Sequence, residues 1–460
     1  MLEIRIVETP GLGDRSYVVT DGRVAVVVDP QRDIDRVLDA AGDAAITHVL
    51  ETHVHNDYVT GGLALARRCG ATYVMNAHDP VAFERLGVRD GDTIVTGSLR
   101  VRVIHTPGHT PTHLAYAISA GDDDAPGDAP GDVAVFTGGS MLYGAMGRTD
   151  LIDPARTEDL TRAQHRSAHR LAAELPDATP VYPTHGFGSF CSATATKGTA
   201  STIGLEKRQN IALTTGEDDF VAALLAGLTA YPRYYVRMAP LNLVGPDEPD
   251  LSLPQLADAA VLEHRLAHGE WIVDLRSRRA YAAGHVRGTV SIELADPFAT
   301  YVGWTVPWEA PLTLLGDDAD QVLAARRQLV RIGIDRLEGA AIGPVHELAP
   351  GGEVASYRRA TFAELAAELP TRRDEIVVLD VRRTDEWEAG HIDGAVHVPF
   401  FELRGRQHEL PEGEVWVHCV SGYRAAIGAS LVDCAGRRAV HIDDDWEHAA
   451  QVGLTVVRGD

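Results

Sequence analysis

One cysteine of this chain lies in a setting that favours a nucleophile. The string VWVHCVSGYRAA, Val415 to Ala426, predicts a β-strand, a tight loop that starts at Cys419, and a helix. Such a loop turns backbone N–H groups inward at the positive end of the helix dipole, where a thiolate is stabilised. Arg424 adds a fixed positive charge at the rim. We therefore predict Cys419 and Arg424 as catalytic residues, with Ser421 and Gly422 binding the substrate.

Histidines near the N-terminus have the spacing of metal ligands. In ETHVHNDY, Glu51 to Tyr58, two histidines flank a single residue in a loop after a predicted strand, and an aspartate follows. Two imidazoles placed in this way can turn toward one ion. Two later turns, TPGHT and YPTHG, each add one histidine. The candidate ligands are His53, His55, Asp57, His109 and His185.

The elements that must position these ligands form a layered α/β pattern over residues 1–205. Short apolar strands such as Val24 to Val28 alternate with helical stretches such as Leu63 to Cys69. The acidic, Gly- and Pro-rich segment Gly121 to Asp132 predicts a solvated loop without chemistry. Residues 206–250 lose the alternation, and we interpret them as a structured connector with a helix over Asp219 to Leu228.

An internal repeat predicts two copies of one βα module in the C-terminal half. WIVDLRSRRAYAAGHVRGTV, which starts at Trp271, matches IVVLDVRRTDEWEAGHIDGAV, which starts at Ile376. Each copy indicates a buried strand that ends in Asp-x-Arg, a helix, and an Ala-Gly-His turn. The earlier copy has Gly316 where the later one has Cys419. We expect residues 251–350 to have a structural or docking role and residues 351–460 to carry the reaction.

Composition narrows the class of protein. The chain has 460 residues, enough for about two to four domains. Its 66 acidic and 42 basic residues give a formal net charge of −24, which works against binding to nucleic acid or to an anionic membrane. Small-molecule substrates fit this charge better. The start of the chain has no basic segment followed by an apolar run, so we predict a cytoplasmic protein, with a homo-oligomer as a candidate state.

The cysteines are widely spaced and few for a chain of this length, so any one that matters is expected to act as a thiol. We interpret Cys69 and Cys434 as small buried hydrophobic residues. Cys191 lies near His185 in a Gly-, Ser- and Thr-rich loop, where simple packing is the preferred interpretation.

Residues 1–205 resemble the metallo-β-lactamase superfamily, especially its glyoxalase II and persulfide dioxygenase branches. The resemblance implies an αββα sandwich that holds one metal ion, iron or zinc, at one edge. The GRTD end of VFTGGSMLYGAMGRTDL implies that Arg148 helps to hold a thiol or glutathione persulfide.

Two positions depart from the pattern of that superfamily. Tyr58 stands where the family usually has a histidine, and Gly139 stands where it usually has a ligating aspartate. Three possibilities follow for the metal. Either His53, His55 and His109 hold the ion, or Asp57 or His185 substitutes for the missing ligand, or no metal binds.

From about Phe362 to the C-terminus the chain resembles the rhodanese superfamily. The resemblance implies that Cys419 takes a sulfane sulfur to become a persulfide and then passes it to an acceptor thiol. Cys419 and Arg424 enclose four residues, and a ring of this size suits one sulfur atom better than a tetrahedral phosphate. The expected fold is thus α/β, an αββα metallo-β-lactamase sandwich followed by two rhodanese-like α/β modules.

Three hypotheses about function follow. The leading one is persulfide dioxygenase-like oxidation of a thiol persulfide coupled to sulfane sulfur transfer, with a thiol persulfide, a glutathione-like thiol or thiosulfate as substrates. The second is a glyoxalase II-like hydrolase, in which a metal-bound hydroxide attacks a glutathione thioester. The third is a metal-free thiol-binding N-terminal module that serves the sulfurtransferase.

Overall fold

The chain divides into two compact units. The computed structural model describes residues 2–121, 133–194 and 196–458. The first unit comprises Met1–Asp250 with Val330–Gly333, and the second comprises Leu251–Leu329 with Ile334–Asp460. Apart from Gly121, the predicted loop Gly121 to Asp132 lies outside the described residues. Within the described part of the chain, no helix is both long and apolar enough to span a membrane.

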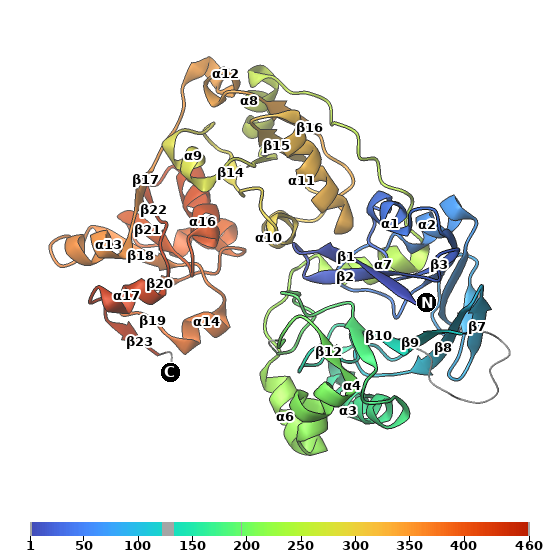
Figure 1. Ribbon diagram of the computed structural model, residues 1–460. Helices are drawn as coiled ribbons and strands as arrows, with labels where there is room; N and C mark the ends of the chain where they lie inside the picture. The colour runs from blue at the N-terminus through green and yellow to red at the C-terminus, as the bar shows by residue number, and fades with distance from the viewer. Residues whose placement is uncertain (1, 122–132, 195, 459–460) are drawn as a thin grey trace. The chain divides into compact units, whose positions relative to one another are not determined.

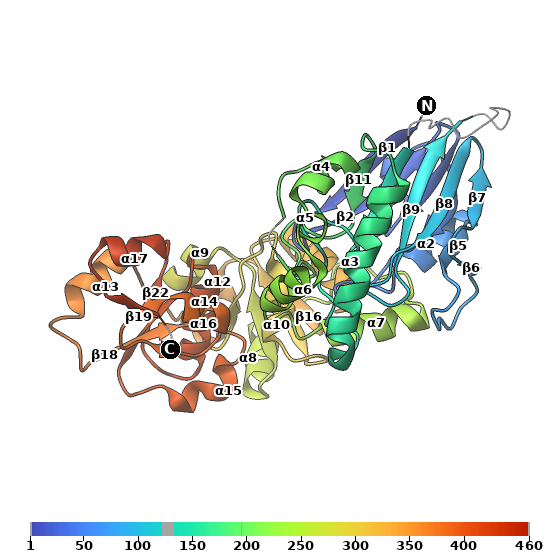
Figure 2. The same ribbon diagram turned by 90° about the horizontal axis from the view of Figure 1, so that it is seen from below.

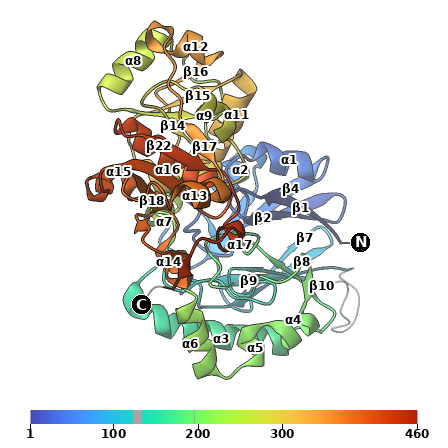
Figure 3. The ribbon, with the colours of Figure 1, turned by 90° about the vertical axis from the view of Figure 1, so that its left-hand side faces the viewer.

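The first unit is built on two six-stranded sheets with the orders β1-β2-β3-β4-β5-β6 and β12-β11-β10-β9-β8-β7. Figures 1 and 3 show these sheets between two layers of helices, with α1 and α2 on one outer side and α3 to α6 on the other. The predicted αββα sandwich is confirmed. The strands are β1 (Glu3–Thr9), β2 (Asp14–Thr20), β3 (Val24–Val28), β4 (Ala45–Leu50), β5 (Thr72–Asn76), β6 (Leu86–Val88), β7 (Thr93–Thr96), β8 (Leu99–His105), β9 (Leu114–Ala120), β10 (Val133–Gly138), β11 (Pro180–Pro183) and β12 (Ser201–Thr202).

The sequence of strand β3 is suited to the centre of a sandwich. Successive side chains of a strand point to opposite faces of the sheet. Val26 and Val28 belong to the core between the two sheets, whereas Ala25 and Val27 belong to the core under α1 and α2. A strand buried on both faces needs an unbroken apolar run, and VAVVV supplies one.

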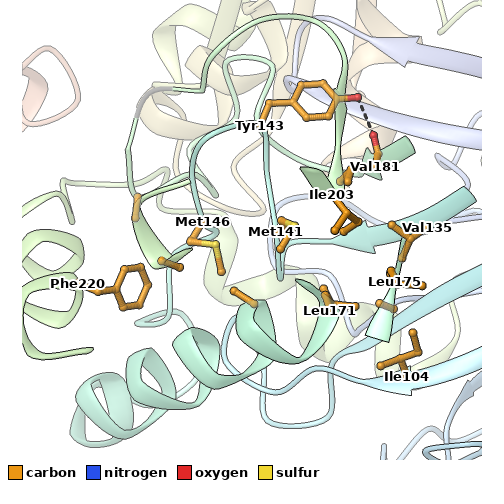
Figure 4. Close-up of a cluster of buried hydrophobic side chains, with 14 of the residues drawn as sticks. Ile104, Val135, Met141, Tyr143, Met146, Leu171, Leu175, Val181, Ile203 and Phe220 are labelled. Carbon is orange, nitrogen blue, oxygen red and sulfur yellow. Dashed lines mark hydrogen bonds between the residues drawn. The ribbon is translucent and has the colours of Figure 1, made fainter. Parts of the chain in front are cut away.

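The segment 206–250, predicted as a connector, belongs to the first unit and completes its core. Phe220 and Leu224 pack with residues of β8, β10, β11 and α3, and Figure 4 shows Phe220 beside Met146. In Figure 2, α3 lies across the face of the second sheet. The helices are α1 (Asp35–Ala41), α2 (Gly62–Cys69), η1 (Pro154–Arg156), α3 (Thr157–Glu174), α4 (Ile203–Gln209), α5 (Ile211–Thr214), α6 (Glu217–Ala226) and α7 (Tyr235–Val244).

The second unit contains two parallel sheets, with the orders β14-β13-β15-β16 and β17-β22-β21-β18-β20, and a small ladder of β19 and β23. Its strands are β13 (Trp271–Asp274), β14 (Val290–Ser291), β15 (Leu312–Gly316), β16 (Gly339–Ile342), β17 (Arg358–Ala360), β18 (Ile376–Asp380), β19 (His391–Ile392), β20 (Val396–His397), β21 (Glu414–His418), β22 (Ala439–Ile442) and β23 (Val456–Val457).

Helices surround both sheets. They are α8 (Ala259–Ala267), α9 (Arg278–Ala283), α10 (Phe298–Thr305), α11 (Ala319–Arg331), α12 (Val345–Leu348), η2 (Pro350–Gly352), α13 (Phe362–Glu368), α14 (Thr384–Ala389), α15 (Leu403–Arg406), η3 (Gln407–Glu409), α16 (Tyr423–Cys434) and α17 (Glu447–Gln451). We call the part built on β13 to β16 the middle module and the part built on β17 to β23 the last module.

The two modules repeat the same contacts. In the middle module the guanidinium of Arg276 pairs with Asp274, its Nη2 2.6 Å from Oδ2, and also donates to the Gly284 carbonyl at 2.9 Å. In the last module Arg382 pairs with Asp380 and donates to the Gly390 carbonyl at 2.7 Å. The Asp-x-Arg motif therefore ties a strand end to the turn that follows the next helix, and it serves the fold.

Strand pairing also shows which residue of the middle module occupies the position equivalent to Cys419. Asp274 lies opposite Leu315, as Asp380 lies opposite His418. Gly316 therefore takes the place that Cys419 has in the last module.

Candidate functional site

The first candidate site lies where loops from both sheets meet at one edge of the sandwich. The candidate ligands follow β4, β8 and β11, so each loop carries its side chain from the end of a strand. All the histidines and the aspartate are buried. His53, His109 and His185 each offer one ligand atom, and these atoms lie within 4.8 Å of one another. His55, Asp57 and His185 form a second such group.

Several polar atoms of this cluster have no hydrogen-bond partner among the described residues. They include His109 Nε2, His55 Nδ1 and Asp57 Oδ1. The Nε2 atoms of His53 and His185 lie 3.3 Å apart. Buried polar atoms are nearly always paired, so lone pairs that converge without a partner fit a bound cation. The donor set of imidazoles and a carboxylate suits zinc or iron.

Neighbouring residues fix the tautomers of His53 and His109. The Nδ1 of His109 donates to the Arg148 carbonyl at 2.6 Å. The Nδ1 of His53 lies 2.8 Å from Thr52 Oγ1, and because that hydroxyl donates to Asp29, it accepts from His53. Both contacts hold the proton on Nδ1 of the ring and leave its Nε2 lone pair free, as a metal ligand requires.

His185 is held by carboxylates from two different parts of the first sheet. Its Nδ1 lies 2.9 Å from Asp14 Oδ1 and 3.0 Å from Asp57 Oδ2. Burial alone would lower its pKa, but Asp57 and Asp14 raise the pKa of His185 well above its usual value. Burial lowers the pKa of His109 to about 3, so that this ring is neutral. A carboxylate behind an imidazole both orients the ring and increases its basicity as a ligand.

Tyr58, which stands in place of a usual histidine, contacts His55 and not the centre of the cluster. Its hydroxyl lies 3.0 Å from His55 Nε2, which is also 3.2 Å from Glu51 Oε2 and 3.3 Å from Asp29 Oδ1. Burial disfavours a charged ring here, but Asp29 and Glu51 outweigh it and raise the pKa of His55 to about 9. Nε2 of His55 is thus engaged by these oxygens, and Nδ1 is the nitrogen of this ring that has no hydrogen-bond partner among the described residues.

The second departure, Gly139, is packed closely against the ring of His109. A Cβ atom at this position would lie 2.6 Å from His109 Cγ and 2.7 Å from His109 Nε2. The His109 ring thus occupies the space that an aspartate side chain would need. In addition, the Gly139 N–H donates to His113 Nε2 at 3.1 Å. The usual carboxylate ligand cannot be restored here without moving a histidine.

Sequence reasoning missed several residues of this site. Asp14 begins β2 and Asp29 follows β3. Both are distant from the histidines in sequence, and only the fold brings them close. Asp29 has a φ of 49°, a left-handed conformation that L side chains rarely adopt. His113 lies in TPTH, four residues after His109, and a search for paired histidines would have found it.

Arg148, predicted to bind a persulfide, is turned into the protein. Its guanidinium pairs with Asp150 at 2.7 and 2.8 Å and donates to the carbonyls of Phe190 and Thr229. Cys191 is buried beside it, where burial and the neighbouring Asp57 raise the pKa of the thiol well above its usual value. A role for Arg148 in holding substrate stays a prediction.

The second candidate site is the loop between β21 and α16. Cys419 is buried, with 2% of its surface exposed. Gly422 has a φ of +85°, and a Cβ atom there would lie 2.6 Å from Asp443 Oδ1, so only glycine fits. The Gly422 carbonyl accepts a hydrogen bond from His441 Nε2 at 2.8 Å. Ser421 is exposed at the tip of the loop.

Arg424 lies beside this loop but is not free. Its two terminal nitrogens bind the carboxylate of Glu386 at 2.6 and 2.8 Å. Burial disfavours the charge of the Glu386 carboxylate, yet Arg424 and Arg383 hold the pKa of Glu386 below its usual range. The structure thus brings Cys419, Gly422 and Arg424 together, and it adds Glu386 as the residue that orients Arg424.

Family models match both halves of the chain. The model of the metallo-β-lactamase superfamily matches residues 10–185, and the model of the rhodanese-like domain matches residues 361–449. One rhodanese-like domain is therefore identified, and not the tandem pair that the internal repeat predicts. The likeness of the middle module rests on its strand order and its repeated Asp-x-Arg contacts alone.

Individual curated relatives each match only a part of the chain. A probable metallo-hydrolase of Burkholderia pseudomallei is 32% identical over 205 residues, which cover 40% of this chain and 66% of that protein. The putative sulfur carrier protein YrkF of Bacillus subtilis is 33% identical over 100 residues, which cover 21% of this chain and 54% of that protein. The chain spans about half to two thirds of the length of these curated relatives.

One solved structure matches beyond a single half. The crystal structure of a metallo-β-lactamase from Staphylococcus aureus subsp. aureus COL is 25% identical to this chain and has a TM-score of 0.65. The match covers 75% of this chain and 99% of that chain.

Proposed function

Since residues 10–185 form a metallo-β-lactamase domain and residues 361–449 form a rhodanese-like domain, we propose that this chain is an enzyme of sulfur metabolism. In this proposal the first domain uses a metal ion to oxidise a thiol persulfide, and Cys419 of the last module transfers sulfane sulfur. The observation that carries the proposal is the Cys419 loop, in which a buried thiol lies at the start of α16 beside the Arg424 guanidinium.

The transfer step needs no oxidant. The thiolate of Cys419 attacks the sulfane sulfur of thiosulfate, a new S–S bond forms, and the old S–S bond breaks with its electron pair on departing sulfite. An acceptor thiolate then attacks the outer sulfur of the Cys419 persulfide and restores the Cys419 thiolate. The helix N-terminus and Arg424 lower the cost of negative charge on sulfur in both halves.

For the first domain we propose one ion, iron or zinc, held by His53, His109 and His185. One ligand atom of each imidazole lies within 4.8 Å of the others, and Gly139 supplies no carboxylate there. Binding of the ion would displace the proton from His185. When bound, iron would supply the oxygen chemistry that persulfide oxidation requires. The protein's own part is to fix the imidazoles through Thr52, Asp14 and the Arg148 carbonyl, and to keep the ligand site dry.

The overall oxidation balances with oxygen as the named oxidant. A persulfide RSSH, one O₂ and one water give RSH and sulfurous acid, so that the sulfane sulfur is oxidised and oxygen is reduced. Sulfite is itself an acceptor of sulfane sulfur, and its product with the Cys419 persulfide is thiosulfate. A tether between the two activities raises the effective concentration of the shared intermediate.

The test is to supply glutathione persulfide to the purified chain and to follow oxygen uptake while iron is quantified. We expect bound iron and oxygen consumption, both lost in a His109→Ala variant. A chain without iron that consumes no oxygen would remove the dioxygenase half of the proposal and leave the transferase half standing.

A second candidate function is hydrolysis of a glutathione thioester, which the 32% identity to a probable metallo-hydrolase favours. Such chemistry usually draws on two ions with a bridging carboxylate, and Gly139 cannot supply that carboxylate. Bound zinc together with thioester hydrolysis would select this candidate over persulfide oxidation.

A further inference from the structure

The middle module, which has no nucleophile of its own, is packed against the start of the helix that follows Cys419. The ring of Tyr301, from α10, lies 5.0 Å from the ring of Tyr423 and 5.4 Å from the ring of Phe400. Trp304, one turn further along α10, lies 4.4 Å from Phe401. Both partners of Tyr301 belong to the last module, so α10 forms an aromatic wall beside the Cys419 loop.

Polar contacts fix this wall in place. The hydroxyl of Tyr423 donates to the carbonyl of Glu293, which precedes α10. Arg278 Nε lies 2.7 Å from Asp443 Oδ1, the same atom that closes the space above Gly422. Farther along α16, Ser430 Oγ accepts from the Ser291 N–H at 3.0 Å. The middle module therefore contacts the Cys419 loop at its base and α16 along its length.

Tyr301 is the residue of this wall whose hydroxyl could take part in the reaction. Its phenol lies within electrostatic reach of Arg424, Cys419, Glu386 and Arg383. Burial raises the pKa of Tyr301; the charge of Arg424 opposes this rise, and negative charge at Cys419 adds to it. The hydroxyl is therefore protonated at neutral pH, and a protonated phenol donates a hydrogen bond to an anion.

We propose that Tyr301 of the middle module is a substrate-positioning residue of the sulfur-transfer site and donates a hydrogen bond to an anionic sulfur species at Cys419. That species is thiosulfate before the transfer and the outer sulfur of the Cys419 persulfide after it. The role rests on the proposed transferase function of Cys419. It also gives the middle module a part in the reaction that exceeds the structural or docking role expected from its missing cysteine.

The experiment compares Tyr301→Phe with Tyr357→Phe in the full chain, using thiosulfate as donor and cyanide as acceptor. Tyr357 is a matched control because its hydroxyl is buried without a partner among the described residues, and its ring contacts His285. Tyr301→Phe removes one oxygen and keeps the aromatic wall. We expect kcat/KM for thiosulfate to fall roughly ten- to hundredfold, the size of a hydrogen bond to a charged group, with most of the loss in KM.

Melting temperature and persulfide formation are measured beside the kinetics. We expect Tyr301→Phe to melt with the parent, and Tyr357→Phe to match the parent in kinetics as well. Parent-like KM and kcat in Tyr301→Phe would overturn the role of the phenol while leaving Cys419 as the transferase. A loss of kcat/KM matched by an equal loss in Tyr357→Phe would also overturn it. If the parent itself forms no persulfide on Cys419, the proposed function fails and this role fails with it.

Discussion

Glu386 and Arg424 form a two-pronged ion pair beside Cys419, with N–O distances of 2.6 and 2.8 Å. The two residues come from different helices, α14 and α16, so the ion pair connects α14 to the helix that follows Cys419. Because both terminal nitrogens of the guanidinium are engaged, its plane is fixed relative to the Cys419 loop.

This geometry predicts that Arg424→Lys is not a conservative change. A lysine keeps the charge but cannot bind both carboxylate oxygens of Glu386 in parallel, so its position beside Cys419 is lost. We expect kcat/KM for sulfur transfer from thiosulfate to fall about tenfold. Arg404→Lys is the control, since Arg404 stacks on Trp271 and has no contact with Glu386 among the described interactions. Equal activity of the two variants would show that the two-pronged pair is irrelevant.

The His53, His109 and His185 cluster predicts that metal content depends on His185. We expect His185→Ala to lower bound metal about tenfold or more, because it removes a ligand that no carboxylate replaces. His169→Ala, on the exposed side of α3, should keep the content of the parent. Elemental analysis of the purified proteins is the measurement. Full metal content in His185→Ala would mean that the ion is held by another set, such as His53, His55 and His109.

The contact between Gly139 and His109 predicts a steric cost for any side chain at position 139. Gly139→Ala places a Cβ atom inside the imidazole ring's space, and we expect the first unit to lose about 1–3 kcal/mol of unfolding free energy. Gly216→Ala is the control, because a Cβ atom there meets no neighbour within 4 Å among the described residues. Chemical denaturation compares the two. An unchanged Gly139→Ala would show that the His109 ring moves aside freely.

Asp443 predicts a pH dependence of the stability of the second unit. Burial favours the neutral acid, but the ion pairs with Arg278 and Arg359 hold the pKa of Asp443 below its usual range. The stabilisation is therefore complete above the unfolded pKa of about 4 and is lost as the pH falls through the lower folded pKa. We expect Asp443→Asn to melt lower than the parent near neutral pH, with a smaller gap below about pH 4. A gap that is constant with pH would refute this account.

Local strings were enough to locate the Cys419 loop and most of the buried histidine cluster. The Cys419 loop is a continuous strand-loop-helix, and His53, His55 and Asp57 lie within one short string. Alternation of apolar strands and helices predicted a layered α/β fold, and the resemblance to the metallo-β-lactamase superfamily implied the αββα sandwich. Strand β3 shows how an unbroken apolar run marks a strand buried on both faces.

The rest depends on contacts between residues far apart in sequence. Asp14 orients His185 over a separation of 171 residues, and no spacing rule relates them. The same holds for Tyr301. Its helix contains no recognisable motif, and only the fold shows that Tyr301 lies beside Tyr423. Residues 206–250 were interpreted as a connector because they lose the alternation of strands and helices, yet Phe220 packs in the core of the first unit.

The most direct test of the whole account is mass spectrometry of the chain after incubation with thiosulfate and removal of the donor. We predict that the peptide containing Cys419 gains the mass of one sulfur atom, that a reductant removes this mass, and that Cys419→Ser gains nothing while Cys434→Ser behaves as the parent. An unmodified Cys419 in a folded parent chain, or sulfur found on another cysteine, would contradict the assignment of this loop as the sulfur-transfer site.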